Sequence, residues 1–158
     1  MTGHENKNAP GEERLLFDFP PSKPAGQLPP IALAYLGDAV FELAIRQYLI
    51  TGANLRPHYL HREATKLVSA GAQARLLFRL EGVLTEEEAD IVRRGRNAKS
   101  GTMPKNANVI DYRHATALEC LAGYLYYKGE HGRLEELIRI GLSAGKDAAA
   151  EAREPERD

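Results

Sequence analysis

Residues 31–50 have the sequence IALAYLGDAVFELAIRQYLI, in which fifteen of the twenty residues are apolar. These apolar residues are spread around the whole circumference of a helix. They predict a helix over about 30–50 that is buried on most sides, either by its own domain or by a partner subunit. The charged residues Asp38, Glu42 and Arg46 follow one another at four-residue intervals. This spacing makes Glu42 and Arg46 a candidate surface ion pair.

Asp38 is unusual for its place in the middle of this helix. Aspartate is a poor helix-interior residue, and the neighbouring Gly37 costs about 1 kcal/mol relative to alanine. Two unfavourable residues side by side in a strongly apolar helix indicate that another backbone, or a ligand of the carboxylate, comes close at this point. The alternative is that Asp38 has a purely structural role.

A second acid lies in the apolar stretch ATALECLAGYLYY, residues 115–127. A lone carboxylate in such a helix is costly to bury unless it meets a cation, so Glu119 either pairs with a Lys or Arg or faces a metal ion. Asp38 and Glu119, on two separate helices, can converge on one divalent cation. A ligand set of oxygens alone favours magnesium or manganese over zinc.

A basic window covers residues 91–110, with the sequence IVRRGRNAKSGTMPKNANVI and five cations without an anion. Gly95 and Gly101 allow the backbone to approach phosphate, and the absence of aromatic residues favours a duplex backbone over unpaired bases. A solvated helix end followed by a mobile loop is the alternative. The candidate RNA-binding residues are Arg93, Arg94, Arg96, Asn97, Lys99, Ser100, Lys105 and Asn106.

The chain as a whole is expected to be all-α, because no stretch shows the alternation of a strand. Six prolines in residues 1–30 predict a flexible extension over 1–27, followed by a folded domain over 28–145 and a charged tail over 146–158. Thr85 followed by three glutamates predicts a capped helix start. The expected helices cover about 30–50, 57–70, 71–81, 85–96, 111–129 and 131–143.

Composition excludes several classes of protein. The 158 residues carry a net charge of −1 and one cysteine, so nucleic-acid affinity must come from a local patch, and an intrachain disulfide framework is ruled out. No apolar run approaches the roughly 20 residues of a membrane span, and the first residues lack the pattern of a secretory signal. A cytoplasmic protein without a membrane association is therefore expected.

Several of these segments resemble the ribonuclease III family, in particular its compact bacterial branch, the Mini-ribonuclease III family. YLGDAVFEL at 35–43 resembles the signature helix, and TALECLAGYLYY at 116–127 resembles the second acidic motif. The stretch RRGRNAKSGTMPKNANVIDYRHATALE at 93–119 is similar to the segment that joins them in the compact branch. The resemblance covers about residues 28–143.

The resemblance implies a ribonuclease III endonuclease-domain fold, a homodimer, and cleavage of double-stranded RNA that depends on Mg²⁺, for which Mn²⁺ substitutes. It makes Asp38 and Glu119 both catalytic residues and metal ligands. It further implies maturation of the 23S ribosomal RNA precursor, with a pre-ribosomal particle as a further partner. Ala34 and Thr116 stand where larger family members carry two more acids. A noncatalytic RNA-binding dimer of the same fold is the alternative.

Overall fold

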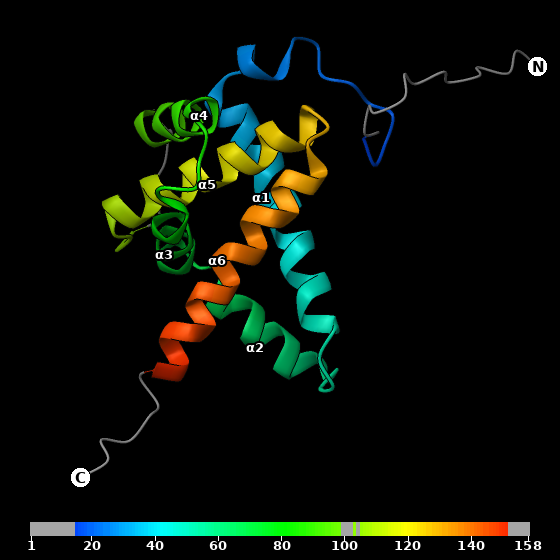
Figure 1. Ribbon diagram of the computed structural model, residues 1–158, viewed down its shortest axis with the longest axis vertical. Helices are drawn as coiled ribbons and strands as arrows, with labels where there is room; N and C mark the ends of the chain where they lie inside the picture. Colours follow the sequence, from blue (N-terminus) through cyan, green and yellow to red (C-terminus); the bar gives the residue numbers. More distant parts are fainter. Residues whose placement is uncertain (1–14, 99–102, 104, 152–158) are drawn as a thin grey trace, which may run out of the picture.

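The computed structural model describes residues 15–98, 103 and 105–151. All regular secondary structure within these residues is helical, as the sequence predicts. One 3-10 turn precedes six α-helices, which are arranged around a single core (Figure 1). The elements are η1 (Ala25–Gln27), α1 (Pro30–Ile50), α2 (Pro57–Val68), α3 (Ala70–Leu80), α4 (Glu86–Asn97), α5 (Val109–Tyr127) and α6 (His131–Glu151).

The helix ends follow the capping chemistry expected from the sequence. The Thr85 hydroxyl accepts a hydrogen bond from the backbone N–H of Glu88 at 3.1 Å, and the Glu88 carboxylate accepts one from the backbone N–H of Thr85 at 2.9 Å. This capping box satisfies two N–H groups that a helix start leaves without partners. Gly82 after α3 and Gly129 after α5 have φ values of +87° and +75°, a region that glycine adopts without strain.

α5 is the central helix of the fold. It packs against α1, α3, α4 and α6, and in Figure 1 α4 and α3 lie on opposite sides of it. Its buried residues include Leu118, Leu121 and Leu125, which all belong to the main hydrophobic core. Because most sides of α5 are covered by other helices, a charged residue on it must either reach a gap between them or find a partner.

α1 and α5 cross at unusually short distance through two glycines. A Cβ atom at Gly37 would lie 1.6 Å from the backbone oxygen of Glu119, and one at Gly123 would lie 2.0 Å from the backbone oxygen of Leu33. No side chain larger than hydrogen fits at either position without moving a helix. The close backbone approach that the sequence predicts beside Asp38 is therefore confirmed.

The two ends of the described chain differ from expectation. The sequence predicts that the domain begins at residue 28, but Ala25 is already buried in the core and η1 contacts α5. The sequence also predicts that the last helix ends near residue 143, whereas α6 continues to Glu151. The alanines that follow Gly145 have the highest helix propensity of all residues, which offsets the cost of one glycine.

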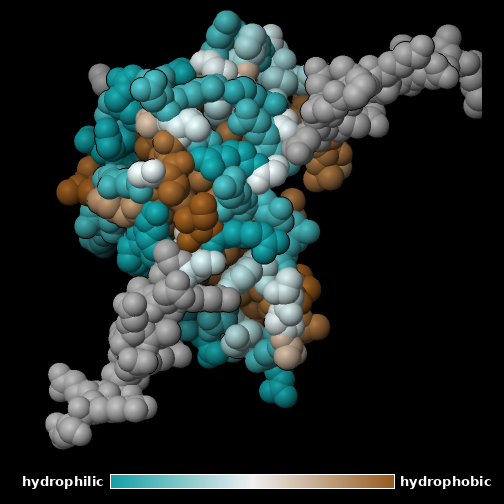
Figure 2. All heavy atoms as spheres, in the orientation of Figure 1, coloured by the Kyte–Doolittle hydropathy of each residue, from teal (hydrophilic) through white to brown (hydrophobic). Residues whose placement is uncertain are grey.

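Hydrophobic side chains reach the surface along α1. Ile31, Tyr35, Leu43 and Ile50 are 41%, 86%, 48% and 58% exposed. On the face drawn in Figure 2, apolar patches interrupt an otherwise polar surface, including one near the C-terminal end of α1. Contacts within the chain therefore bury only part of the α1 surface that the sequence predicts to be buried. None of the described helices has the length and hydropathy needed to cross a bilayer.

The glycine crossing yields a first prediction. Gly37→Ala places a methyl group where the Glu119 carbonyl lies, so it should lower the free energy of unfolding by about 3 kcal/mol, despite the better helix propensity of alanine. Urea unfolding measures this change. Gly26→Ala is the control, because its nearest neighbour would be Tyr124 Cε2 at 3.9 Å. Equal stability of Gly37→Ala and wild type would contradict the close crossing.

Candidate active site

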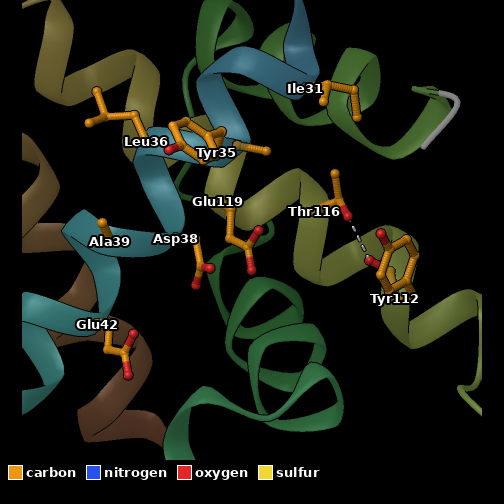
Figure 3. A pocket seen from close by; sticks show the side chains of 10 residues that line it. Ile31, Tyr35, Leu36, Asp38, Ala39, Glu42, Tyr112, Thr116 and Glu119 are labelled. Carbon is orange, nitrogen blue, oxygen red and sulfur yellow. Dashed lines mark hydrogen bonds between the residues drawn. The ribbon is translucent and has the colours of Figure 1, made fainter. Parts of the chain in front are cut away.

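A pocket of about 520 Å³ opens between α1 and α5 (Figure 3). α1 forms one wall with residues that precede and follow Gly37, and α5 forms the other over its first three turns. The loop that enters α5 therefore ends within one helical turn of the pocket. The polar residues that line the pocket are Tyr35, Asp38, Glu42, Tyr112, Thr116 and Glu119.

Asp38 and Glu119 line this same pocket from two different helices (Figure 3). Asp38 follows Gly37 directly, and the space beside Gly37 is filled by the backbone of Glu119. The glycine crossing thus sets the two carboxylates side by side. Asp38 is exposed, whereas Glu119 is half-buried, so the second carboxylate lies deeper in the pocket.

The two carboxylates repel each other, and no cation among the described residues neutralises them. Within the described residues, neither Asp38 nor Glu119 forms an ion pair with a Lys or Arg. Burial, and then the charge of Asp38, raise the pKa of Glu119 to about 7. Burial and the nearby Glu42 also raise the pKa of Asp38. As expected, Glu42 pairs with Arg46 at 3.1 Å instead of remaining free.

Gln73 is a contact of the site that the sequence did not reveal. It lies on α3, is 2% exposed, and its side chain lies near enough to Glu119 to lower the pKa of that carboxyl. This effect on the pKa of Glu119 opposes that of burial. Local sequence offers a weak signal, since Gln73 is the uncharged polar residue in the helix AGAQARLLFRL. The pattern of α3 does not say which helix faces it.

The pocket suits a hard divalent cation that keeps much of its water. Among the described residues, no group of three or more His, Cys, Asp or Glu side chains lies close enough together to hold a metal ion. Asp38 and Glu119 therefore offer two carboxylates and no soft ligand. Mg²⁺ is commonly bound through one or two carboxylates together with waters and substrate phosphate oxygens, which matches this donor set.

The basic window divides into two groups of residues. Arg93 forms an ion pair with Asp90, and the Arg94 guanidinium donates a hydrogen bond to the backbone oxygen of Gly26 at 3.0 Å. Arg94 therefore ties the segment before α1 to α4. Gly95 does not offer its backbone to phosphate as the sequence suggests, because it is buried against Ala117 and Cys120 of α5.

The remaining candidates in the window are exposed, as far as the structure describes them. Arg96, Asn97, Lys105 and Asn106 all lie at the surface. The side chains of Arg96 and Lys105 make no hydrogen bond or ion pair with other described residues. Asn106 adopts a left-handed conformation with φ of +66°, which asparagine tolerates better than most residues. Lys99 and Ser100 lie outside the described residues.

Comparison with known proteins agrees with this arrangement. The Ribonuclease III domain profile matches residues 31–130. "Mini-ribonuclease 3" of Brevibacillus brevis is 50% identical over 110 residues, which make up 70% of this chain and 82% of that protein. "Mini-ribonuclease 3" of Enterococcus faecalis is 54% identical over 114 residues, or 71% of this chain and 86% of the relative.

The chain belongs to the Mini-ribonuclease 3 family. This family is a branch of the ribonuclease III endoribonucleases, so the resemblance found in the sequence is confirmed. The crystal structure of a Fusobacterium nucleatum protein superposes with a TM-score of 0.69 at 31% identity, covering 78% of this chain and 99% of the other. The all-α ribonuclease III fold is thereby confirmed as well.

Ala34 and Thr116 line the pocket at two positions where larger members of the family are expected to carry acids. Ala34 is buried and presents only a methyl group to the pocket. The Thr116 hydroxyl donates a hydrogen bond to the backbone oxygen of Tyr112 at 3.0 Å, one turn earlier in α5 (Figure 3). Neither residue adds a negative charge, so Asp38 and Glu119 are the acids that face the pocket together with the ion-paired Glu42.

The raised pKa of Glu119 gives a prediction for the metal-free protein. The unfolded chain loses the Glu119 proton near pH 4.5, whereas the folded protein keeps it up to about pH 7. Ionisation of Glu119 therefore lowers stability as pH rises through this window. Glu119→Gln cannot ionise, so its advantage in melting temperature over wild type should grow from pH 4.5 to 7 and then level off.

Thermal unfolding in a chelator, measured at several pH values, tests this expectation. Glu81→Gln is the control, because it removes an exposed carboxylate at the end of α3. A difference between wild type and Glu119→Gln that stays constant from pH 4.5 to 7 would show that Glu119 is not desolvated in solution.

Proposed function

We propose that the chain is a Mg²⁺-dependent endoribonuclease that cleaves double-stranded RNA. The observation that carries this proposal is the meeting of Asp38 and Glu119 in one pocket without a cationic partner among the described residues. Two carboxylates of like charge in one pocket, one of them half-buried, are unfavourable in the free protein. A divalent cation relieves this repulsion, and Mn²⁺ satisfies the same oxygen ligands.

In the proposed mechanism, Asp38 and Glu119 are the residues that hold the cation and act as the catalytic pair. When bound, Mg²⁺ supplies Lewis-acid chemistry to the phosphodiester and to the attacking water. Asp38, at the open side of the pocket, is the carboxylate closer to substrate, and Glu119 anchors the deeper side. Glu42 forms an ion pair with Arg46. In this mechanism it contributes only the charge of its carboxylate to the electrostatic field of the pocket.

The basic window supports a duplex as the substrate. Arg96 and Lys105 carry charges that are not used within the described residues, and the window leads into α5 one turn before Tyr112 of the pocket. Cations in this position suit the closely spaced phosphates of a double helix. The ribose 2′-hydroxyls of A-form RNA lie in its shallow minor groove, where side chains can recognise them.

The exposed apolar residues of α1 support a homodimer. Ile31 and Tyr35 line the pocket, Leu43 lies further along α1, and Tyr35 is 86% exposed. A second copy that covers this surface would bury it and place two pockets on one assembly, one for each strand of a duplex. The proposed homodimer therefore accounts for both the apolar surface and a double-strand cut.

The proposed natural substrate is the precursor of 23S ribosomal RNA, within a pre-ribosomal particle in the cytoplasm. This part of the proposal depends on the resemblance to the Mini-ribonuclease III family. Cleavage of an isolated precursor duplex, compared with an unrelated duplex of equal length, tests the preference directly.

A noncatalytic RNA-binding dimer is the second candidate function. Ala34 and Thr116 favour it, because a pocket with fewer acids than larger family members can hold RNA without cutting it. Incubation of the purified protein with long duplex RNA, once with Mg²⁺ and once with chelator, separates the two functions. Cleavage that requires Mg²⁺ supports the enzyme, whereas binding without cleavage in either condition supports the second candidate.

Asp38→Asn should reduce cleavage of duplex RNA by roughly 10³-fold, which equals about 4 kcal/mol of transition-state stabilisation. The substitution removes one carboxylate charge while keeping the shape of the side chain, so folding and metal-free RNA binding should be unchanged. Single-turnover cleavage and a gel-shift assay in chelator measure the two effects. Turnover at the wild-type rate would reject Asp38 as a metal ligand.

Replacing Arg96 and Lys105 together by alanine should weaken binding of duplex RNA regardless of sequence. If each cation contacts one phosphate, the slope of log K against log salt should fall by roughly 2. Fluorescence anisotropy at several salt concentrations measures this slope. Arg139→Ala is the control, since Arg139 pairs with Glu135 on α6. An unchanged slope would remove Arg96 and Lys105 from the RNA interface.

A further inference from the structure

A second cationic region lies outside the basic window. Residues 43–80 contain six Lys and Arg residues and a single acid, Glu63, although the whole chain has a net charge of −1. Arg46 and Arg79 are used within the fold, the first in an ion pair and the second in a hydrogen bond to a backbone oxygen. The other cations of this region are Arg56, Arg62, Lys66 and Arg75. Two of these lie on α2.

α2 separates its apolar and polar residues onto two faces. Its inner face packs on α1 and α3, and Leu67 and Val68 contact the main core. The opposite side, which we call the outer face of α2, consists of exposed residues that recur with the helical period, so they form one stripe. These residues are His58, His61, Arg62, Thr65 and Lys66. The outer face contains no acid, because Glu63, the one acid of α2, is half-buried.

One carboxylate is shared by both cations of the outer face. The Lys66 Nζ atom lies 3.1 Å from Glu63 Oε1, and the Arg62 Nε atom lies 3.7 Å from the same oxygen. The Arg62 guanidinium also lies over the Tyr59 ring, at 5.7 Å from the ring centroid. The side chains of Arg62 and Lys66 are nevertheless 56% and 64% exposed. The outer face therefore keeps a net positive charge at positions that a ligand can reach.

The outer face of α2 is well separated from the basic window. Along the long axis of the molecule, α4 lies toward one end and α2 toward the other, with the crossing of α1 and α5 between them (Figure 1). Arg96 of α4 and the outer face of α2 thus place positive charge on both sides of this crossing. A nucleic-acid duplex carries closely spaced negative charge along its whole length, so one duplex can contact both regions.

We propose that the outer face of α2 is a second contact surface for the phosphate backbone of duplex RNA. The proposal rests on the proposed function of the pocket. Exposed Arg and Lys side chains, accompanied by polar donors, are the groups that position a protein on a duplex backbone without reading its sequence. An acidic protein would suit the same cations, but it would leave the affinity for RNA independent of this face.

Arg62→Ala and Lys66→Ala test the proposal through the salt dependence of RNA binding. Each substitution should lower the slope of log K against log salt by roughly 1, and the double variant should lower it by roughly 2. Fluorescence anisotropy with a long duplex RNA in chelator measures binding without cleavage. Arg139→Ala is the matched control, because Arg139 is an exposed arginine that pairs with its own acid, Glu135, at 3.1 Å. It should leave the slope unchanged.

Glu63→Gln should change the affinity in the opposite direction. It keeps the shape of the side chain and removes the only acid of α2, so duplex RNA should bind roughly threefold more tightly at low salt. Glu135→Gln on α6 is the control and should bind RNA like wild type. Because a poorly folded variant would lose affinity, a gain in Glu63→Gln separates a true contact from misfolding.

Two results would overturn the contact at α2 while leaving the proposed function in place, provided that wild type cleaves duplex RNA. One is an unchanged slope in Arg62→Ala and Lys66→Ala, or an equal fall in Arg139→Ala. The other is a Glu63→Gln variant that binds RNA no more tightly than wild type. A wild-type protein that neither binds nor cleaves duplex RNA in Mg²⁺ would instead overturn the proposed function.

Discussion

The contact between the backbones of α1 and α5 at Gly37 and Gly123 is the constraint on which the site depends. With hydrogen in place of side chains, the two helices approach until the Glu119 carbonyl fills the space beside Gly37. Asp38 is the next residue along α1, so its carboxylate is brought to the side of Glu119 by helix packing alone. The same contact that closes the core therefore also creates the acidic pocket.

This arrangement has a cost that the rest of the fold has to offset. Asp38 and Glu119 repel each other, and burial makes ionisation of Glu119 unfavourable up to about pH 7. Two apolar residues at these positions would pack without this repulsion. In the free protein, the repulsion between the two carboxylates makes the pocket electrostatically unfavourable. Such a pocket is suited to a function in which a bound cation supplies the positive charge.

The basic window shows that a charge run can serve two purposes. Arg94 stabilises the fold through Gly26, and Arg93 pairs with Asp90 in the same helix, whereas Arg96 and Lys105 form no ion pair or hydrogen bond with the residues that the structure describes. The net charge of the window is therefore larger than the charge that could contact RNA. The sequence shows the run of cations but does not separate these roles, because the partner of Arg94 lies 68 residues away.

The sequence by itself determined the six helices, the cap at Thr85, the close approach at Gly37 and the two anomalous acids, because periodicity, capping and unfavourable propensity are local properties of the chain. Only the tertiary structure decided that Gln73 lies near Glu119, that Gly95 is buried against α5 and that Arg94 holds the segment before α1. These contacts join residues far apart in sequence. Their geometry follows from how whole helices pack, which no local pattern records.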